Sequence, residues 1–352
     1  MRAFDVRKYF FTDMRHYNIP VFIPELACPN QCIYCNQRHI SGQLEPVSTA
    51  QVRDIIDRHL KSFKYPCEVE LAFFGGSFTG LKISEQEEYL ATVQPYIKQG
   101  TISSIRLSTR PDYIDSEILN LLKQYKVRTI ELGAQSLCDE VLQYCERGHS
   151  VRDVELSSAM IKSKGFSLGL QMMVGLPLDT PERSKQTALK IVELGADNTR
   201  IYPTLVIKHT KLAELYEARM YKPLSLTEAV EHTAEIYKIF TANGINILRV
   251  GLHPSEGLIS GTELVAGPFH VSFRELVLSR IWLERLQSLP EDCVSIRLNP
   301  KDVNYAIGYQ SCNRKHLKAI NREIELIQDN SIARDSFLIN HIRLNRNALS
   351  QN

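Results

Sequence analysis

Apolar residues follow two alternating periodicities between about residue 20 and residue 250. Short segments with apolar residues at every second position predict strands, and each is followed by a stretch with apolar residues three and four apart, which predicts an amphipathic helix. The predicted strands cover residues 20–24, 68–74, 104–109, 127–132, 166–174, 198–202 and 245–250. Strands separated by amphipathic helices imply βαβ crossovers and a parallel sheet. We count six or seven such units, short of the eight of a closed TIM barrel, and predict a partial (β/α)6 TIM-like barrel.

Several predicted helices begin at recognisable capping residues. A serine or threonine followed three residues later by Glu or Gln, or directly by proline, is typical of a helix N-terminus. The N-caps predicted in this way are Ser48, Ser84, Thr180 and Ser225.

The strand–helix repeats stop near Leu252, and the last hundred residues have a different pattern. Here we expect a helix over 273–287, a short strand over 293–298, a helix over 313–327 and then mixed strand. The predicted organisation is therefore an N-terminal arm (1–19), the partial barrel (20–252) and a small α+β C-terminal region (253–352).

Composition excludes few function classes. The 352 residues include 42 basic and 40 acidic side chains, so net charge names no partner. No apolar run approaches the length of a membrane span, and the first twenty residues are too charged for a signal peptide. We expect a reduced, cytoplasmic protein without membrane contact.

Charge is uneven only near the C-terminus. Residues 297–352 hold nine Lys or Arg against five Asp or Glu, including the basic cluster 314–318. Such a cluster is compatible with a site for a polyanion such as RNA, and equally with the solvated face of a helix. The pattern does not separate these two interpretations.

Three cysteines stand close together in the N-terminal part of the chain. Cys28, Cys32 and Cys35 have the spacing C-x3-C-x2-C, and thiolates are typical ligands of zinc or iron–sulfur clusters. Structural zinc needs four ligands, and only His39 is nearby. A cubane cluster held by three cysteines instead leaves one iron open to a small molecule, although a zinc loop stays an alternative. The other cysteines lack such spacing and are expected to be buried, inert thiols without an auxiliary cluster: Cys67, Cys138, Cys145, Cys293 and Cys312.

Polar and glycine residues follow the predicted strands. In parallel α/β barrels, ligands bind at the carboxyl ends of the strands, so these residues are candidates for a common site. The candidates are Gly75, Gly76, Ser108, Gln135, Arg147, Val174, Gly175, Tyr202, Lys208, Arg249 and His253.

The cysteine motif with Tyr34 before its third cysteine resembles the radical-SAM superfamily, whose core is a partial barrel. The ordered stretches Gly75-Gly76, 108–112 (STRPD), 131–136 (ELGAQS), 147–149 (RGH) and 174–182 (VGLPLDTPE) are similar to the radical-SAM half of the Elongator catalytic subunit and its bacterial relatives, which modify tRNA. Oxygen-independent coproporphyrinogen III oxidases resemble the chain less closely. The resemblance covers about residues 18–255.

The resemblance implies roles for individual residues. Cys28, Cys32 and Cys35 would hold a [4Fe–4S] cluster, and a flavodoxin- or ferredoxin-like donor would reduce it. The resemblance also implies contacts to S-adenosylmethionine (SAM). Its adenine would meet the backbone at Tyr34 and Val174-Gly175, and its methionyl amine would meet Gly75-Gly76. Its ribose and carboxylate would meet Ser108, Gln135 and Arg147. From the residues alone, a surface ion pair for Arg147 and a capping side chain for Gln135 stay alternatives. Tyr202 and Lys208 are our candidates for catalytic residues, with Arg249 and His253 nearby where substrate could enter.

The chain also departs from the Elongator pattern. About a hundred residues follow the barrel, too few for an acetyltransferase domain, and the first interval between the cysteines is shorter. The cysteine triad that a methylthiotransferase needs upstream is absent. Our preferred hypothesis is an enzyme that cleaves SAM to a 5′-deoxyadenosyl radical and acts on an RNA base, with tRNA as the partner. The alternatives are action on a porphyrinogen-like metabolite and a non-catalytic, metal-binding RNA-binding protein.

Overall fold

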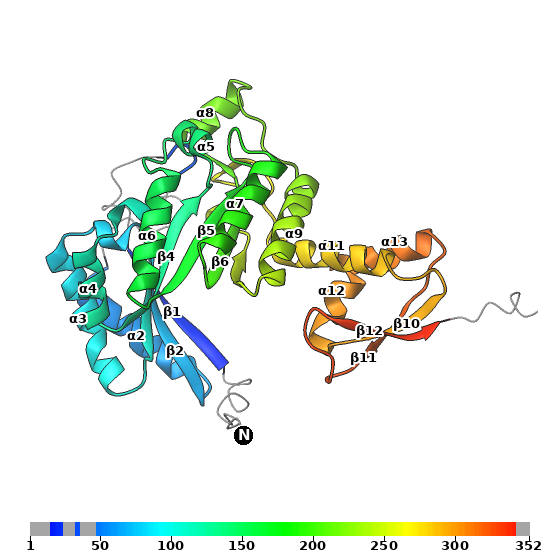
Figure 1. Cartoon of the computed structure of the whole chain (residues 1–352), viewed down its shortest axis with the longest axis horizontal. Coiled ribbons are helices and arrows are strands. Elements are labelled where there is room, and N and C mark those ends of the chain that lie inside the picture. Colours follow the sequence, from blue (N-terminus) through cyan, green and yellow to red (C-terminus); the bar gives the residue numbers. More distant parts are fainter. Residues whose placement is uncertain (1–14, 24–31, 36–46, 343–352) are drawn as a thin grey trace, which may run out of the picture.

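The computed structural model describes residues 15–23, 32–35 and 47–342. Within them, the main sheet has seven parallel strands in the order β1-β2-β3-β4-β5-β6-β8 (Figure 1). The sheet curls into a half-barrel. β1 and β8 are its two edges and do not pair with each other, so the barrel is not closed, and the prediction of a partial barrel is confirmed. The strands are β1 (Arg15–Ile23), β2 (Cys67–Gly75), β3 (Ser104–Thr109), β4 (Val127–Gln135), β5 (Ser167–Val174), β6 (Asn198–Pro203) and β8 (Asn246–Val250).

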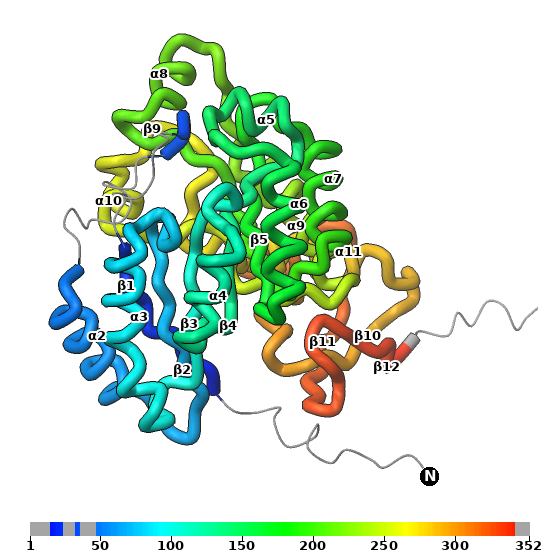
Figure 2. Tube along the Cα trace, turned by 60° about the vertical axis from the view of Figure 1, so that its left-hand side comes forward, coloured from blue at the N-terminus to red at the C-terminus, as the bar shows by residue number. Residues whose placement is uncertain are grey.

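Amphipathic helices cover the convex face of this sheet (Figure 1). They are α2 (Thr49–Ser62), α3 (Ile83–Lys98), α4 (Ser116–Gln124), α6 (Val151–Ser163), α7 (Pro181–Glu193) and α9 (Leu226–Ala242). Sequence analysis missed short elements in the loops after β4, β6 and β8, because each is too short for a clear periodicity. These are α5 (Asp139–Tyr144), β7 (Val206–Ile207), α8 (Lys211–Glu217), α10 (Glu256–Ile259) and β9 (Leu264–Ala266), near the carboxyl ends of the strands (Figure 2).

Three of the four predicted N-caps are confirmed. The side chains of Ser48, Thr180 and Ser225 each accept a hydrogen bond from a backbone N–H in the first turn. The prediction for Ser84 is wrong, since α3 begins at Ile83 and its N-cap is Lys82. The backbone N–H of Lys82 donates to the carboxylate of Glu85, and the side chain of Lys82 makes no capping hydrogen bond.

The first strand starts earlier than predicted. β1 begins at Arg15 rather than near residue 20, and it pairs with β2 residue by residue up to Ile23. Polar residues such as His16 and Asn18 lie on the concave face, where the sheet does not need an apolar side chain, and this hid the strand in the sequence pattern.

The C-terminal region contains a second, smaller sheet in the order β11-β10-β12. Its elements are α11 (Phe273–Gln287), β10 (Cys293–Leu298), α12 (Val303–Ile307), α13 (Cys312–Ala319), β11 (Glu325–Gln328) and β12 (Phe337–Ile342). The helix predicted over 313–327 is too long, because the chain turns at Asn321, whose φ is +55°. Arg322 then donates to the carbonyls at the end of α11, those of Gln287, Leu289 and Pro290.

One helix belongs to both hydrophobic cores. Phe273, Val277 and Ile281 of α11 pack with the main core between sheet and helices. Trp282 and Leu286, further along the same helix, lie in the core of the small sheet. None of the helices in the described ranges is both long and apolar enough to cross a membrane.

Candidate functional site

The segment Cys32–Cys35 is held at the carboxyl end of the sheet. The N–H of Cys35 donates to the carbonyl of Cys32 (2.8 Å), which makes a tight turn. Ile33 donates to the carbonyl of Cys145 after α5 (3.2 Å) and accepts from the N–H of Leu212 in α8 (2.7 Å). The two short helices therefore hold two of the three predicted metal ligands, Cys32 and Cys35. The third, Cys28, lies outside the described residues.

Arg147 points at this turn. Its Nη1 donates to Sγ of Cys32 (3.4 Å) and its Nη2 to the carbonyl of Gly133 on β4 (2.7 Å). The side chain is buried, so the alternative of a surface ion pair is wrong. A guanidinium beside a cysteine ligand compensates the negative charge that thiolates bring to a bound metal.

Gln135 ends β4 in an unusual backbone conformation. Its φ is +64°, it is buried, and its Oε1 accepts from Nε2 of Gln171 on β5 (3.1 Å). A non-glycine residue in the left-handed region costs free energy, and such residues cluster at functional sites. Sequence analysis missed Gln171, although a lone polar residue in the apolar segment of β5 was a visible signal.

The Gly75-Gly76 stretch requires glycine at its first position. Gly75 has a φ of +105°, and a Cβ there would lie 2.5 Å from the carbonyl oxygen of Ile23. The N–H of Gly76 donates to that same oxygen (2.7 Å). The ends of β1 and β2 are thereby held in contact, at the point where β1 leads in sequence into the predicted cluster loop.

We expect Gly75→Ala to disturb this junction strongly. The new methyl group meets backbone rather than a flexible side chain, and the positive φ adds strain, together about 2–4 kcal/mol of lost stability. Gly100→Ala is the matched control, because Gly100 also has a positive φ (+73°) but nothing within 4 Å of its Cβ position. Urea denaturation of both variants measures the difference, and equal losses would contradict the proposed contact with Ile23.

The backbone at Val174-Gly175 is engaged inside the protein. The carbonyl of Val174 accepts from the N–H and Oγ1 of Thr204, both at 2.9 Å. Gly175 donates its N–H to Asp179 (3.1 Å) and accepts at its carbonyl from the hydroxyl of Tyr221 (2.6 Å). Because these backbone groups are already hydrogen-bonded within the protein, they offer a ligand such as adenine a rigid surface to pack on rather than free hydrogen-bonding groups.

The candidates from the other strand ends are only partly brought together. Ser108 and Tyr202 are half-buried on the concave face, and Arg249 is half-buried at the end of β8. Lys208 and His253 are exposed in the loops that follow β7 and β8. The first three residues are thus placed to face a ligand in the half-barrel, and the last two lie at its rim.

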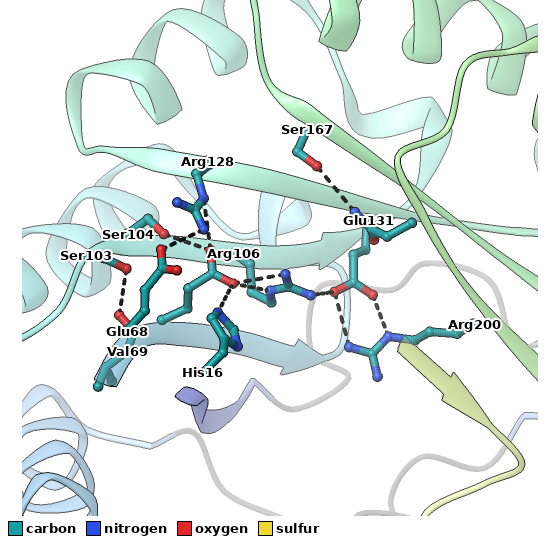
Figure 3. Close-up of polar contacts among 12 residues, drawn as sticks. His16, Glu68, Val69, Ser103, Ser104, Arg106, Arg128, Glu131, Ser167 and Arg200 are labelled. Carbon is teal, nitrogen blue, oxygen red and sulfur yellow. Dashed lines mark hydrogen bonds and ion pairs between the residues drawn. The ribbon is translucent and has the colours of Figure 1, made fainter. Parts of the chain in front are cut away.

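A buried ionic layer crosses the concave face below these residues (Figure 3). Arg106 of β3 donates to Glu70 of β2 (3.0 Å) and to Glu131 of β4 (2.9 Å). Arg200 of β6 donates to both carboxylate oxygens of Glu131, at 2.5 and 3.1 Å. Four strands are cross-linked in this way, and sequence analysis did not predict it.

Glu70 has a strongly shifted pKa. Burial would raise the pKa of this carboxyl, but the hydrogen bond from His16 and the charge of Arg106 outweigh burial and lower the pKa to about 2. Ser104 and Arg128 act in the same direction. The carboxylate is therefore ionised at all ordinary pH values.

Acid should weaken the fold through Glu70. A glutamate with a folded-state pKa near 2 and an unfolded-state pKa near 4.3 stabilises the fold above the unfolded value and loses that contribution as the pH falls between the two. We expect a loss on the order of 2 kcal/mol in the free energy of unfolding between about pH 5 and pH 2. Urea titrations of wild type and Glu70→Gln across this range measure it. An equally steep loss in the variant would contradict the assignment.

The remaining five cysteines meet the expectation of burial fully in two cases. Cys145 and Cys293 are buried, Cys67 and Cys138 half-buried, and Cys312 is exposed. Cys312 was expected to be buried, but it begins α13 on the surface of the small domain. Among the described residues, no group of three His, Cys, Asp or Glu side chains could hold a metal.

The residues present fit a thiolate-bound cluster with a ligand beside it. Cys32 and Cys35 share one turn, Arg147 donates to the sulfur of Cys32, and Gly75 lets the ends of β1 and β2 meet without an intervening side chain. The buried hydroxyl of Tyr34 has no hydrogen-bond partner among the described residues, which leaves it a donor for a bound group.

Comparisons with known proteins agree with this geometry. Residues 23–191 match the model of the radical SAM superfamily, and residues 196–285 match the radical SAM C-terminal domain. A tRNA uridine(34) acetyltransferase of Methanocaldococcus jannaschii is 28% identical over 47% of this chain and 34% of its own length. Human Elongator complex protein 3 is 26% identical over 86% of this chain and 59% of its own length.

A solved structure shares the fold. The archaeal Methanocaldococcus infernus Elp3 matches with a TM-score of 0.62 at 22% identity, over 81% of this chain and 66% of that one. The chain thus spans about a third to three fifths of the length of the curated relatives described above.

Proposed function

This chain belongs to the radical SAM superfamily of enzymes, and on that premise we propose that it carries a [4Fe–4S] cluster on Cys28, Cys32 and Cys35 and modifies a base of tRNA. The cluster, when bound, supplies the electron that cleaves SAM to methionine and a 5′-deoxyadenosyl radical. Membership in an enzyme family overturns the alternative of a non-catalytic metal-binding protein. A flavodoxin- or ferredoxin-like protein is the proposed electron donor.

One observation supports the cofactor assignment most strongly. Arg147 links Sγ of Cys32 to the carbonyl of Gly133, so the cysteine turn and the end of β4 are held together by one guanidinium. A zinc loop that only fixed the N-terminus would not need a buried arginine that joins it to the sheet interior. We also assign the SAM carboxylate to Arg147, because a guanidinium carries several N–H donors that suit a carboxylate.

The chain's own residues would orient SAM and exclude water. Gly75 and Gly76 give the methionyl amine access to the ends of β1 and β2, and Tyr34 and Val174-Gly175 offer apolar surface to adenine. Gln135, fixed by Gln171, and Ser108 would bind ribose hydroxyls. The proposed catalytic residues are Tyr202, near the end of β6, and Lys208, directly after β7, on the side where substrate would approach.

The substrate class rests on the relatives. Proteins similar to this chain are named as tRNA uridine(34) acetyltransferases and as Elongator complex protein 3. We carry over only the coarser property, action on a tRNA base, because the chain spans part of those proteins. A porphyrinogen-like substrate has no supporting contact among the described residues.

Anaerobic reconstitution tests the proposal. Wild-type protein with iron, sulfide, SAM and dithionite should contain four irons and form 5′-deoxyadenosine, and unmodified tRNA should accelerate that formation and change mass. Protein that binds zinc, or a cluster that never cleaves SAM, would refute the cofactor assignment. Cleavage that tRNA does not affect would refute the substrate class alone.

A further inference from the structure

Two aromatic side chains lie next to each other on the concave face of the sheet. Phe22 of β1 is the register partner of Phe74 of β2, so both rings leave the sheet on the same side. Their neighbours Val21 and Phe73 point the other way, into the core under the helices. Phe22, on the edge strand β1, is 38% exposed. The pair gives a ligand an apolar aromatic surface on a concave face that is otherwise lined by polar and charged side chains.

An arginine of the ionic layer packs against the second of these two rings. The guanidinium of Arg200, from β6 on the far side of the half-barrel, lies over the ring of Phe74 at 4.8 Å. Glu131 holds this guanidinium through two hydrogen bonds, and Tyr202 adds another. The ionic layer therefore adjoins the ring of Phe74 on the concave face.

The aromatic surface is continuous with the proposed SAM site. Phe22 directly precedes Ile23, whose carbonyl contacts Gly75 and Gly76, and Phe74 directly precedes Gly75. A group stacked on Phe22 would therefore lie beside the proposed position of the SAM amine. That is where a substrate must be if a radical formed from SAM is to reach it.

The charges on this face indicate which ligand fits. Both arginines of the layer, Arg106 and Arg200, are hydrogen-bonded to the carboxylates of Glu70 and Glu131. The positive charges of these two arginines are therefore already compensated within the protein, so they offer little attraction to a ligand that carries several carboxylates. A neutral planar ring matches better, since it stacks on phenylalanine and exchanges hydrogen bonds with Tyr202.

We propose that Phe22, supported by the neighbouring Phe74, is the stacking surface for a single unpaired base of RNA, held beside SAM, with Arg200 and Tyr202 at its edge. This inference rests on the proposed function and adds which residues bind the base. RNA bases that undergo chemistry are extruded and stacked on aromatic side chains, and one such stack contributes enough to be measured by alanine substitution.

A double-mutant cycle on holoenzyme tests the proposal. The probes are an anticodon stem-loop RNA with uridine at position 34, the position named for the archaeal relatives, and the same RNA with an abasic site there. The dissociation constant of each is measured by fluorescence anisotropy for wild type, Phe22→Ala and Phe22→Trp. Leu156→Ala is the control, since Leu156 is also an exposed apolar residue (46%) but lies on α6, on the convex face of the sheet.

We expect Phe22→Ala to weaken binding of the uridine RNA on the order of 10- to 100-fold and to leave binding of the abasic RNA unchanged. Phe22→Trp should restore affinity, which excludes a folding defect as the cause, and Leu156→Ala should match wild type. Equal weakening of both RNAs by Phe22→Ala would overturn the stacking role. Because 5′-deoxyadenosine formation by wild type is measured separately, failure of the proposed function is distinguished from failure of this inference.

Discussion

Replacing Cys32 by alanine is expected to reduce 5′-deoxyadenosine formation to the background of a reaction without enzyme. Cys32 is one of only three predicted thiolate ligands, and its sulfur is the one that Arg147 contacts. A cluster held by two cysteines loses iron, and the SAM-binding iron with it. The measurement is iron and acid-labile sulfide content, followed by dithionite-driven SAM cleavage under anaerobic conditions.

Cys312→Ala is the matched control for this variant. Cys312 is an exposed cysteine on α13, in the small domain and away from the cysteine turn. It should bind the same iron and cleave SAM like wild type. If Cys32→Ala kept its iron and its activity, the assignment of the cluster to these cysteines would be wrong.

Glu131→Ala is expected to cause the largest loss of stability. The carboxylate of Glu131 is buried and accepts from Arg106 and Arg200, so its removal leaves two buried guanidinium groups without their shared partner. Breaking a buried ion pair from one side typically costs about 3–5 kcal/mol. We expect a shift of this size in the free energy of unfolding in urea, followed by circular dichroism.

Glu155→Ala is the control that shows whether the loss of stability in Glu131→Ala comes from the burial of the ion pairs or merely from the loss of a negative charge. Glu155 on α6 also pairs with two cations, Lys190 and Arg152, but on the helix surface. Surface ion pairs contribute little because water and salt screen them, so the midpoint should stay near that of wild type. Equal effects of the two variants would show that the ionic layer is not a structural element of the sheet.

Much of the fold could be predicted from local patterns. The seven strands and the caps at Ser48, Thr180 and Ser225 depend on residues close in sequence, and hydrophobic periodicity records them directly. Predictions were wrong where a distant contact decides the local structure. Arg322, for example, leaves the predicted helix over 313–327 to contact the end of α11.

The candidate site was predictable in its motifs but not in its contacts. The positions after each strand gave Gly75, Gln135 and Arg147, and the structure places all three at one end of the sheet. The contact between Arg147 and Cys32 joins residues 115 positions apart, and that between Arg200 and Glu131 joins residues 69 apart. No periodicity encodes such pairs, although one charged residue in each of several apolar strands was a sign of them.

Helix α11 has a consequence for the design of shorter variants. The match to the radical SAM C-terminal domain ends at residue 285, inside this helix. A truncation there would remove Leu286 and the small sheet, and Trp282 would be left in water. A truncation before Phe273 would instead remove all of α11 and expose to water the apolar side chains of α9 and β8 against which this helix packs. No cut in this helix spares both cores, so the barrel and the small sheet are best expressed, and should unfold, as one cooperative unit.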